Sequence, residues 1–261
     1  MSISDKSTVE EIRARFDGEV ERFSNLATGQ TATVDSAHCM DLIARACALS
    51  APQEAAVLDV GCGAGNYSLK ILEYRPKSRV TLVDLSGPML ERAKARLGPA
   101  VDAAIQGDVR ELEFEAERFD VIVAAAVLHH LRSPSEWSGV FARFFRWLKP
   151  GGGLWIFDLV SHEDPRVQDL MWADYGRYLE SMGGAAYRDR VFAYIEKEDT
   201  PTSLTHQIDL LRRVGFASVD VLHKHSCFAA FGGIKACQKN PSPISVSGEP
   251  GVSGQRSATL P

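Results

Sequence analysis

The segment from Val57 to Tyr67 limits the possible folds of this chain more than any other part of the sequence. An apolar run, Val57 to Val60, carries an acid at Asp59 and is followed by glycines spaced G-x-G-x-G before helix-forming sequence resumes. Glycines at such a turn let the backbone adopt positive φ and approach a ligand with no Cβ in the way. The dinucleotide-binding fingerprint is related, but its third glycine falls one residue later, as G-x-G-x-x-G. The pattern predicts a strand, a tight turn and a helix that together hold a ligand by backbone contact.

Further strand-like segments follow, and each ends in polar residues. Arg79 to Asp84 is β-branched and apolar, and it ends in an acid about 20 residues after the first glycine, the offset at which an acid meets ribose hydroxyls. A third strand ends in Ile105 to Val109, a fourth spans Phe119 to Ala124, and a fifth runs from Leu154 to Asp158. Alternating strands and helices predict a parallel sheet, and such sheets bind ligands at the carboxyl ends of their strands.

Together these motifs resemble the class I methyltransferases that depend on S-adenosylmethionine (SAM). The run D-V-G-C-G-A-G, Asp59 to Gly65, is similar to motif I of that family, and L-K-P-G-G-G, Leu148 to Gly153, is similar to its turn before the fifth strand. The resemblance covers roughly Val57 to Lys235. It implies an α/β fold: a Rossmann-like, doubly wound, seven-stranded sheet that is mostly parallel, with its last strand antiparallel. It also implies SAM as the cofactor.

The resemblance also implies roles for individual residues. Asp59 and the glycine loop would hold the methionine end of SAM, and Asp84 would hold the ribose. Asp108 and Val109 would bracket the adenine, with Met89 placed against the flat base. The predicted cofactor-binding residues are Asp59, Gly61, Cys62, Gly63, Gly65, Asp84, Leu85, Met89, Gly107, Asp108, Val109 and Ala125.

His129 and His130, just after the fourth strand, are the candidate catalytic residues. Methyl transfer from a sulfonium is an in-line displacement, so alignment and desolvation supply much of its acceleration. A base is needed only when the acceptor must lose a proton, and a neutral imidazole can take that proton. The alternative is that one of these histidines only anchors the loop. The last two strands are predicted over Ser218 to Leu222 and Cys227 to Ile234, and His223 and His225, in the turn before the last strand, are interpreted as exposed loop residues.

The chain divides into zones by composition and periodicity. Residues 1–53 are predicted to form an N-terminal helical cap, with a capping box in Ser7 to Glu11. Residues 54–237 would form the SAM-binding methyltransferase domain that the resemblance implies, within which residues 159–200 are a predicted helical insertion after the fifth strand. Residues 238–261 are rich in Pro, Ser and Gly, and we expect them to form a disordered tail.

The insertion is the predicted source of substrate specificity. Its tyrosines are Tyr175, Tyr178, Tyr187 and Tyr194. One interpretation is a lid that closes over an apolar or aromatic substrate and excludes water. The alternative is a pair of helices that packs these rings onto the domain. Gly183 and Gly184 would be a hinge or a turn between the helices.

Composition limits the partners. The net charge of −5 and the excess of acids in the insertion disfavour a polynucleotide substrate. The five cysteines form no C-x-x-C pair, so we expect free thiols in a reducing cytoplasm and no metal site. The longest apolar run, Val121 to Leu128, is too short to span a membrane. The predicted partner is a small-molecule substrate, and the predicted state is a monomer or homodimer.

The two ends of the chain add a finer resemblance. Val20 to Asn25 and Ser226 to Lys235 are laid out like the carboxy-SAM synthase branch, although its R-S-I-P-G-Y run has no counterpart here. The leading prediction is transfer of the methyl of SAM to an O, N or C acceptor on a small molecule. The alternatives are a carboxy-SAM synthase-like or RNA-modification enzyme, a nicotinamide-dependent oxidoreductase, and a non-catalytic SAM-binding protein.

Overall fold

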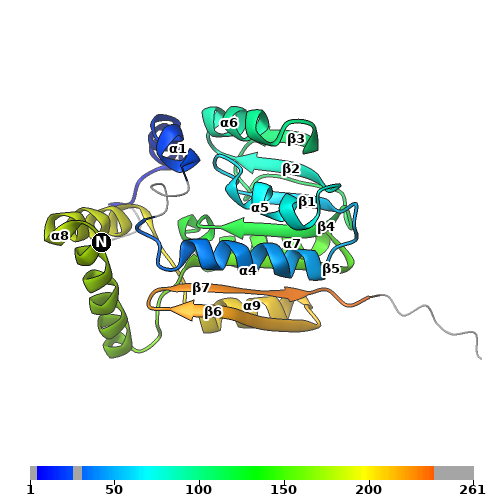
Figure 1. The fold of residues 1–261 in the computed structure, drawn as a ribbon. Coiled ribbons are helices and arrows are strands. Elements are labelled where there is room, and N and C mark those ends of the chain that lie inside the picture. The colour runs from blue at the N-terminus through cyan, green and yellow to red at the C-terminus, as the bar shows by residue number, and fades with distance from the viewer. Residues whose placement is uncertain (1–4, 26–30, 238–261) are drawn as a thin grey trace, which may run out of the picture.

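The computed structural model describes residues 5–25 and 31–237, coloured along the chain in Figure 1. The predicted tail, residues 238–261, lies outside the described residues. The strands are β1 Ala56–Val60, β2 Arg79–Asp84, β3 Val101–Gln106, β4 Phe119–Ala125, β5 Leu148–Leu159, β6 Ser218–His225 and β7 Phe228–Ile234. The α-helices are α1 Val9–Gly18, α2 Val20–Ser24, α4 Ser36–Leu49, α5 Asn66–Tyr74, α6 Gly87–Leu97, α7 Pro134–Trp147, α8 Pro165–Glu198 and α9 Leu204–Val214. Short 3₁₀ turns follow α6 and β4.

The described strands form one seven-stranded sheet in the order β3-β2-β1-β4-β5-β7-β6. β1 to β5 pair in parallel, and β7 lies antiparallel between β5 and β6. This confirms the predicted Rossmann-like sheet with its last strand antiparallel. The strand order reverses between β1 and β4, and open α/β sheets bind ligands at such a switch point.

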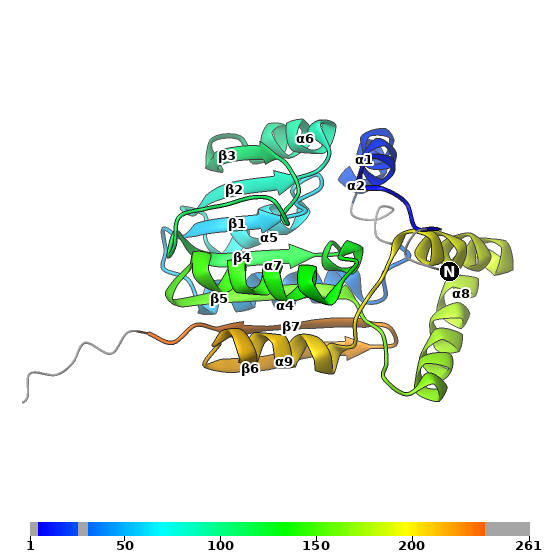
Figure 2. The same cartoon turned by 180° about the vertical axis from the view of Figure 1, so that it is seen from behind.

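Helices cover both faces of the sheet, which explains why its central strands are apolar throughout. α4, α5 and α6 pack on one face, and α7 and α9 pack on the other (Figures 1 and 2). Successive residues of a strand point to opposite faces. Val57 therefore joins the core under α4 and α5, and Leu58 joins the core under α7. Burial on both faces is typical of parallel strands and accounts for their long apolar runs.

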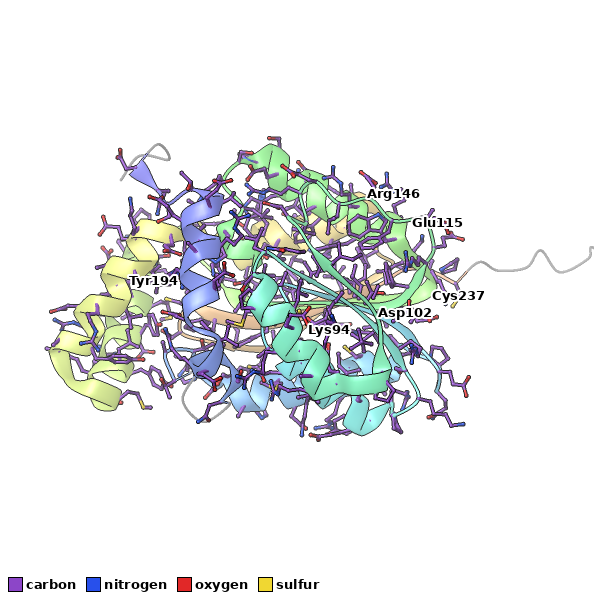
Figure 3. The ribbon with its side chains drawn as sticks, turned by 90° about the horizontal axis from the view of Figure 1, so that it is seen from above. Lys94, Asp102, Glu115, Arg146, Tyr194 and Cys237 are labelled. Carbon is purple, nitrogen blue, oxygen red and sulfur yellow. The ribbon has the colours of Figure 1, made fainter. Side chains whose placement is uncertain are left out.

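The N-terminal segment crosses the carboxyl ends of the strands. Figure 3 shows α1 lying between α6 and α8. The predicted capping box begins α1: Glu11 N donates to Thr8 Oγ1 at 3.2 Å, and Thr8 N donates to Glu11 Oε2 at 2.8 Å. Arg15 donates to both carboxylate oxygens of Glu198 at the end of α8, at 3.0 and 2.6 Å. α1 is thereby attached to the insertion, whereas α4, also within the predicted cap, packs onto the sheet.

The insertion consists mainly of α8, which changes direction in the middle. Gly183 and Gly184 interrupt the helical backbone, and Gly184 has a φ of 75°. The two arms of α8 therefore form the V seen in Figures 1 and 2. None of the helices within residues 5–25 and 31–237 has both the length and the apolar character needed to cross a bilayer.

The interpretation of His223 and His225 as loop residues was wrong. Both belong to β6, which runs to His225 and pairs with β7 as far as Phe228. The pairing register shifts between Val221 and His223, so the strand contains a bulge. Polar and exposed side chains along an edge strand hide its alternation, and this explains the early end predicted for it.

Candidate functional site

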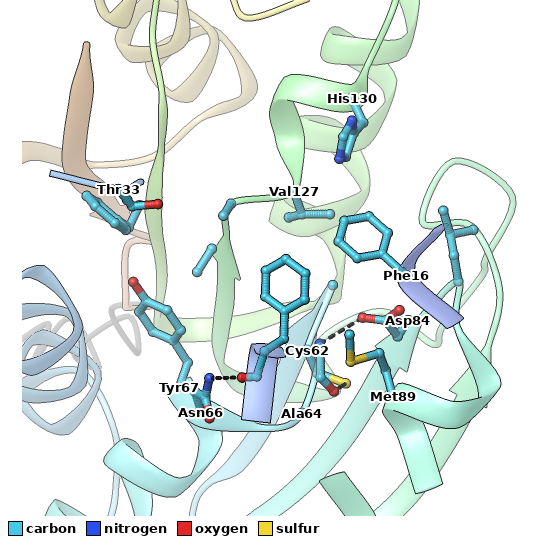
Figure 4. Close-up of a pocket in the computed structure, with 17 residues that line it drawn as sticks. Phe16, Thr33, Cys62, Ala64, Asn66, Tyr67, Asp84, Met89, Val127 and His130 are labelled. Atoms are coloured by element: carbon cyan, nitrogen blue, oxygen red, sulfur yellow. Dashed lines mark hydrogen bonds between the residues drawn. The ribbon is translucent and has the colours of Figure 1, made fainter. Parts of the chain in front are cut away.

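Two adjoining cavities lie at the carboxyl ends of the central strands. The first, the glycine-loop cavity, is lined by Gly61 to Ala64 and Met89 and is drawn in Figure 4. The second, the β3-side cavity, is lined by Gly107 to Arg110 and by Lys6 to Val9. We refer to the two adjoining cavities together as the cleft, and the residues that line both are Gly61, Asp84, Leu85, Val127 and His130.

Most of the residues predicted from the sequence line this cleft. They are Gly61, Cys62, Gly63, Asp84, Leu85, Met89, Gly107, Asp108, Val109, Ala125 and His130. The predicted residues that line neither cavity are Asp59, Gly65 and His129. Gly65 precedes α5 with a φ of 81°, and a Cβ there would lie 2.8 Å from Leu97 Cδ1. Its role is to let α5 and α6 approach each other.

The glycine loop has the backbone that its spacing predicts. Gly61 and Gly63 have φ values of 65° and 49°, a region that L side chains rarely adopt. A Cβ on Gly61 would lie 2.5 Å from Val127 Cγ2, so the turn after β4 leaves no room for a side chain. Cys62 N donates to Val83 O at 3.0 Å, which attaches the loop to β2.

Asp84 stands at the end of β2 and faces both cavities. Gly63 N donates to one carboxylate oxygen at 2.7 Å, and Ser86 N donates to the other at 2.8 Å. Burial raises the pKa of Asp84, and these two hydrogen bonds oppose that rise. An ionised carboxylate has about four acceptor positions, so two remain for a ligand diol.

Asp59 is buried beside the glycine loop rather than in the cleft. Its Oδ2 accepts a hydrogen bond from Ser68 Oγ of α5 at 2.5 Å, and the residue is 2% exposed. Burial raises the pKa of Asp59 to about 7, although the hydrogen bond from Ser68 acts in the opposite direction. The Asp59 carboxylate connects β1 to α5 and lines neither cavity, so its contact with the methionine end stays a prediction.

Asp108 and Arg110 both line the β3-side cavity. Arg110 Nε lies 2.9 and 3.0 Å from the two carboxylate oxygens, and Arg110 Nη1 donates to Glu136 at 3.0 Å. Burial acts to raise the pKa of Asp108, but Arg110 outweighs it and holds the pKa below its usual value. Asp108 is thus an acceptor-only group at neutral pH.

His129 turns away from the cleft and into the protein. Its Nδ1 contacts Asp158 Oδ1, and its Nε2 lies 3.7 Å from Asp199 Oδ1. Asp158 also accepts a hydrogen bond from Leu128 N at 2.7 Å, so it holds the turn in place. Burial acts to lower the pKa of His129, but Asp158 and Asp199 outweigh it and raise the pKa to about 9. Of the two candidate histidines, His129 has the geometry of a loop anchor.

His130 faces the cleft and lines both cavities. Its Nδ1 lies 3.4 Å from Asp199 Oδ1 without a hydrogen bond between them, and neither ring nitrogen has a hydrogen-bond partner in the part of the chain that the structure describes. Burial, reinforced by the neighbouring charge of His129, lowers the pKa of His130 well below 6.5. A neutral imidazole in a ligand cavity can accept a proton.

The sequence analysis missed the apolar and aromatic wall of the glycine-loop cavity. Phe16 and Phe23 come from α1 and α2, and their ring centroids lie 5.5 Å apart. Asn66 Nδ2 donates to Phe23 O at 2.9 Å, which connects α2 to the helix after the glycine loop (Figure 4). Phe16 and Phe23 follow helical spacing, but that spacing does not distinguish a ring on a core from a ring over a cavity.

One polar group of the cleft and one behind it, in contact with His130, were also missed. Tyr67 follows the glycine loop, and its buried hydroxyl has no partner among residues 5–25 and 31–237. Asp199 follows α8, and burial raises its pKa to about 6 although His129 acts to lower it. Asp199 is one of several acids in the insertion, so no sequence signal distinguished it. Asp158 had a signal, since it stands near the end of β5 like the other site acids.

Comparison with known proteins identifies a methyltransferase domain that matches residues 57–152. A malonyl-[acyl-carrier protein] O-methyltransferase from Halalkalibacterium halodurans is 39% identical over 101 residues, covering 37% of this chain and 36% of that protein. A demethylmenaquinone methyltransferase from Lactococcus lactis is 29% identical over 172 residues, covering 63% of this chain and 66% of that protein. The chain thus aligns with between about a third and two thirds of these relatives.

Solved structures share the fold at low sequence identity. Human N-acetylserotonin methyltransferase in complex with SAM has a TM-score of 0.60 at 20% identity, covering 90% of this chain and 64% of that one. The [4+2]-cyclase SpnF has a TM-score of 0.62 at 15% identity, covering 89% of this chain and 98% of that one. Sheet order, glycine loop and the methyltransferase domain matched at residues 57–152 agree with one another, and together they support a class I SAM-dependent methyltransferase.

Proposed function

We propose that the protein transfers the methyl group of SAM to an O, N or C atom of an apolar small molecule. The observation that carries the proposal is the position of His130. Its ring lines the same cleft as the glycine loop and Asp84, and the rest of the wall is largely apolar. A general base beside a cofactor cleft with a largely apolar wall suits an acceptor that loses a proton on methylation.

The residues of the cleft fit SAM. The loop from Gly61 to Ala64 presents backbone where a bulky side chain would fill the space, and we assign it to the methionine end. Asp84 keeps two acceptor positions for the ribose hydroxyls, and charge-assisted hydrogen bonds are stronger than neutral ones. The Asp108 carboxylate suits the exocyclic amine of adenine, beside Val109. When bound, SAM supplies a methyl group already activated by its sulfonium.

The acceptor is assigned to the glycine-loop cavity. Phe16, Phe23, Phe157 and Val127 form its apolar part, and the hydroxyl of Tyr67 is buried there without a partner. A buried polar group without a hydrogen bond is costly, so an acceptor that bonds to Tyr67 would bind more tightly than one that does not. This combination favours a planar or apolar molecule that carries a hydroxyl or a similar polar group.

We assign proton removal to His130 and its orientation to Asp199. Nε2 of His130 is free to accept the acceptor's proton, and the Asp199 carboxylate beside Nδ1 favours the imidazolium that results. His129 and Asp158 hold the turn that carries His130. Asp199 and His129 are therefore positioning residues, whereas His130 contacts the reacting molecule.

α8 supports the cavity indirectly. Its four tyrosines line neither cavity, and Trp172 stacks on Phe192 with ring centroids 4.7 Å apart. Tyr175 Oη donates to Ala32 O at 2.8 Å, next to Thr33 of the cavity wall. The geometry supports the packing interpretation of these rings over direct cover of the substrate. We propose that α8 affects specificity by holding the segment around Thr33.

The names of the relatives do not identify the methyl acceptor of this protein. One name contains malonyl-[acyl-carrier protein] and the other demethylmenaquinone, and a neighbour in fold is a [4+2]-cyclase. A shared fold does not imply a shared reaction. We further expect a cytoplasmic monomer or homodimer that acts on a small molecule and on neither nucleic acid nor membrane. The alternatives are a carboxy-SAM synthase-like enzyme, an RNA-modifying enzyme and a non-catalytic SAM-binding protein. The test below distinguishes them from the proposed function.

The test is transfer of label from methyl-labelled SAM into a cell extract separated into small-molecule, RNA and protein fractions. We expect label in the small-molecule fraction, lost in H130Q and kept in H206Q, a control histidine on α9. Label in RNA or protein would contradict the proposed acceptor. SAM binding with label in no fraction would favour a carboxy-SAM synthase-like or non-catalytic protein, and failure to bind SAM would overturn the proposal.

A further inference from the structure

A second group of donor atoms lies outside the cleft, where β6 meets the residue before α4. His223 Nε2 and His225 Nδ1 each lie 2.8 Å from Asp35 Oδ2. Donor atoms of the three side chains lie within 4.8 Å of one another. The side chains of His223, His225 and Asp35 are 27%, 53% and 36% exposed, so an ion can reach them from solvent.

The local backbone explains why these side chains converge. His223 and His225 are two apart on one strand, and such residues face the same side of a sheet. The bulge between Val221 and His223 lies just before them, and bulges redirect the side chains that follow. Asp35 occupies the cap position of α4 without capping it, and its carboxylate points to the histidines instead.

The donor set matches a borderline transition-metal ion. Imidazole nitrogen and carboxylate oxygen are ligands of Zn²⁺, and two histidines with one carboxylate form a common protein set with open positions for water. In a tetrahedral zinc site, ligand atoms about 2.1 Å from the ion lie about 3.4 Å apart. The observed separations of 2.8 Å are close to this, so small side-chain rotations would admit an ion.

We propose that Asp35, His223 and His225 bind one divalent transition-metal ion, with Zn²⁺ the best match to their chemistry. Water would complete the coordination on the exposed side. The ring of His38 packs edge-on against His223 at 5.2 Å between centroids and restrains its orientation. The expectation of no metal site rested on cysteine spacing and overlooked the alternate histidines of β6.

The ion would have a structural effect on the cleft. Asp35 lies two residues after Thr33, which lines the glycine-loop cavity. Tyr175 and Tyr178 of α8 donate to the carbonyls of Ala32 and Thr31 at 2.8 and 3.0 Å. A metal at Asp35 would therefore join β6 to a segment that already connects α8 to the cavity wall. We expect zinc to raise the melting temperature of the full chain.

The experiment is calorimetric titration of ZnCl₂ into the full chain after chelation and dialysis. Every protein carries C237S, because Cys237 is an exposed thiol that would bind zinc on its own. We expect one saturable site per chain. H223A and H225A should each weaken binding at least tenfold, and the double variant should lose both binding and the zinc-dependent rise in melting temperature. H206A, on α9, is the matched control and should bind as the parent does.

Two further variants keep the test decisive. D35N preserves the size of the side chain and should also weaken binding at least tenfold. His129, His130 and Asp199 are another group of donors within 4.8 Å, so H130A is titrated in parallel. Binding that persists in the double variant, that falls equally in H206A, or that is lost only in H130A would overturn the proposal. Circular dichroism confirms that each variant is folded.

Discussion

The carboxylate of Asp84 accepts a hydrogen bond from the backbone N–H of Gly63 at 2.7 Å. The acid at the end of β2 and the glycine loop after β1 are therefore one structural unit. Because Ser86 N donates to the other carboxylate oxygen, Asp84 also fixes the start of α6. A substitution at Asp84 affects a ligand contact and the shape of the loop together.

We expect D84A to weaken SAM binding at least tenfold, on the order of 1.4 kcal/mol or more, because it removes charge-assisted hydrogen bonds. Calorimetric titration of SAM into the purified variant measures the change. D102A is the matched control, since Asp102 is a half-exposed acid on β3 outside both cavities. Equal SAM affinity in D84A and the parent would disprove the ribose assignment.

The buried position of Asp59 gives a different expectation for D59N. An asparagine can still accept the hydrogen bond from Ser68, and Asp59 itself is partly protonated near neutral pH, since burial raises its pKa to about 7. We expect D59N to change SAM affinity less than threefold, whereas S68A should lower the free energy of unfolding by about 1 kcal/mol. A tenfold loss of SAM affinity in D59N would instead indicate direct contact between Asp59 and SAM.

Gly61 is limited by its neighbour as well as by its backbone. A Cβ there would lie 2.5 Å from Val127 Cγ2, whereas a Cβ on Gly98, at a similar φ of 55°, would have no neighbour within 4 Å. We expect G98A to lower stability through backbone strain alone, and G61A to add crowding against Val127 and to abolish SAM binding. Chemical denaturation of both variants measures the part of the stability loss that is due to crowding. Equal losses of stability in G61A and G98A would contradict a role for Val127 in excluding a side chain.

The low pKa of His130 predicts a pH profile. Since burial lowers that pKa well below 6.5, His130 is neutral from pH 6.5 to 8 and ready to accept a proton. The acid limb of kcat/KM assigned to His130 should therefore lie below pH 6.5. H130Q should lower kcat at least a hundredfold while SAM affinity changes less than threefold. Full activity in H130Q would mean that the acceptor needs no base.

His129 predicts a pH dependence of stability. Its folded pKa, about 9, exceeds the unfolded value of 6.5, so its contribution is fully present below pH 6.5 and is lost as pH rises to about 9. The free energy of unfolding should fall over this window by up to about 3 kcal/mol. H129Q should be less stable at pH 6 and should flatten the curve between pH 7.5 and 9. Urea denaturation at each pH measures the free energy of unfolding. Parallel curves of stability against pH for H129Q and the parent would contradict the ion pair of His129 with Asp158 and Asp199.

The fold was largely predictable because its signals are local. Each central strand is a short apolar run, and the glycine loop requires positive φ wherever it occurs. The capping box of Thr8 and the turn at Gly183 and Gly184 are also short-range features, and the structure has both. β6 was predicted too short because its end is set by pairing with β7, a contact between strands that the sequence of β6 does not display.

The sequence by itself determined the sheet, the glycine loop and the acids at the strand ends, because strand periodicity and glycine conformation depend on neighbouring residues. Only the tertiary structure separated His129 from His130, since Asp158 and Asp199 come from distant segments and surround the first while leaving the second facing the cleft. The same holds for Asp35, brought to His223 and His225 across 188 and 190 positions of the chain. Burial and the neighbouring charged groups set the pKa of a histidine and its role, and both depend on tertiary packing.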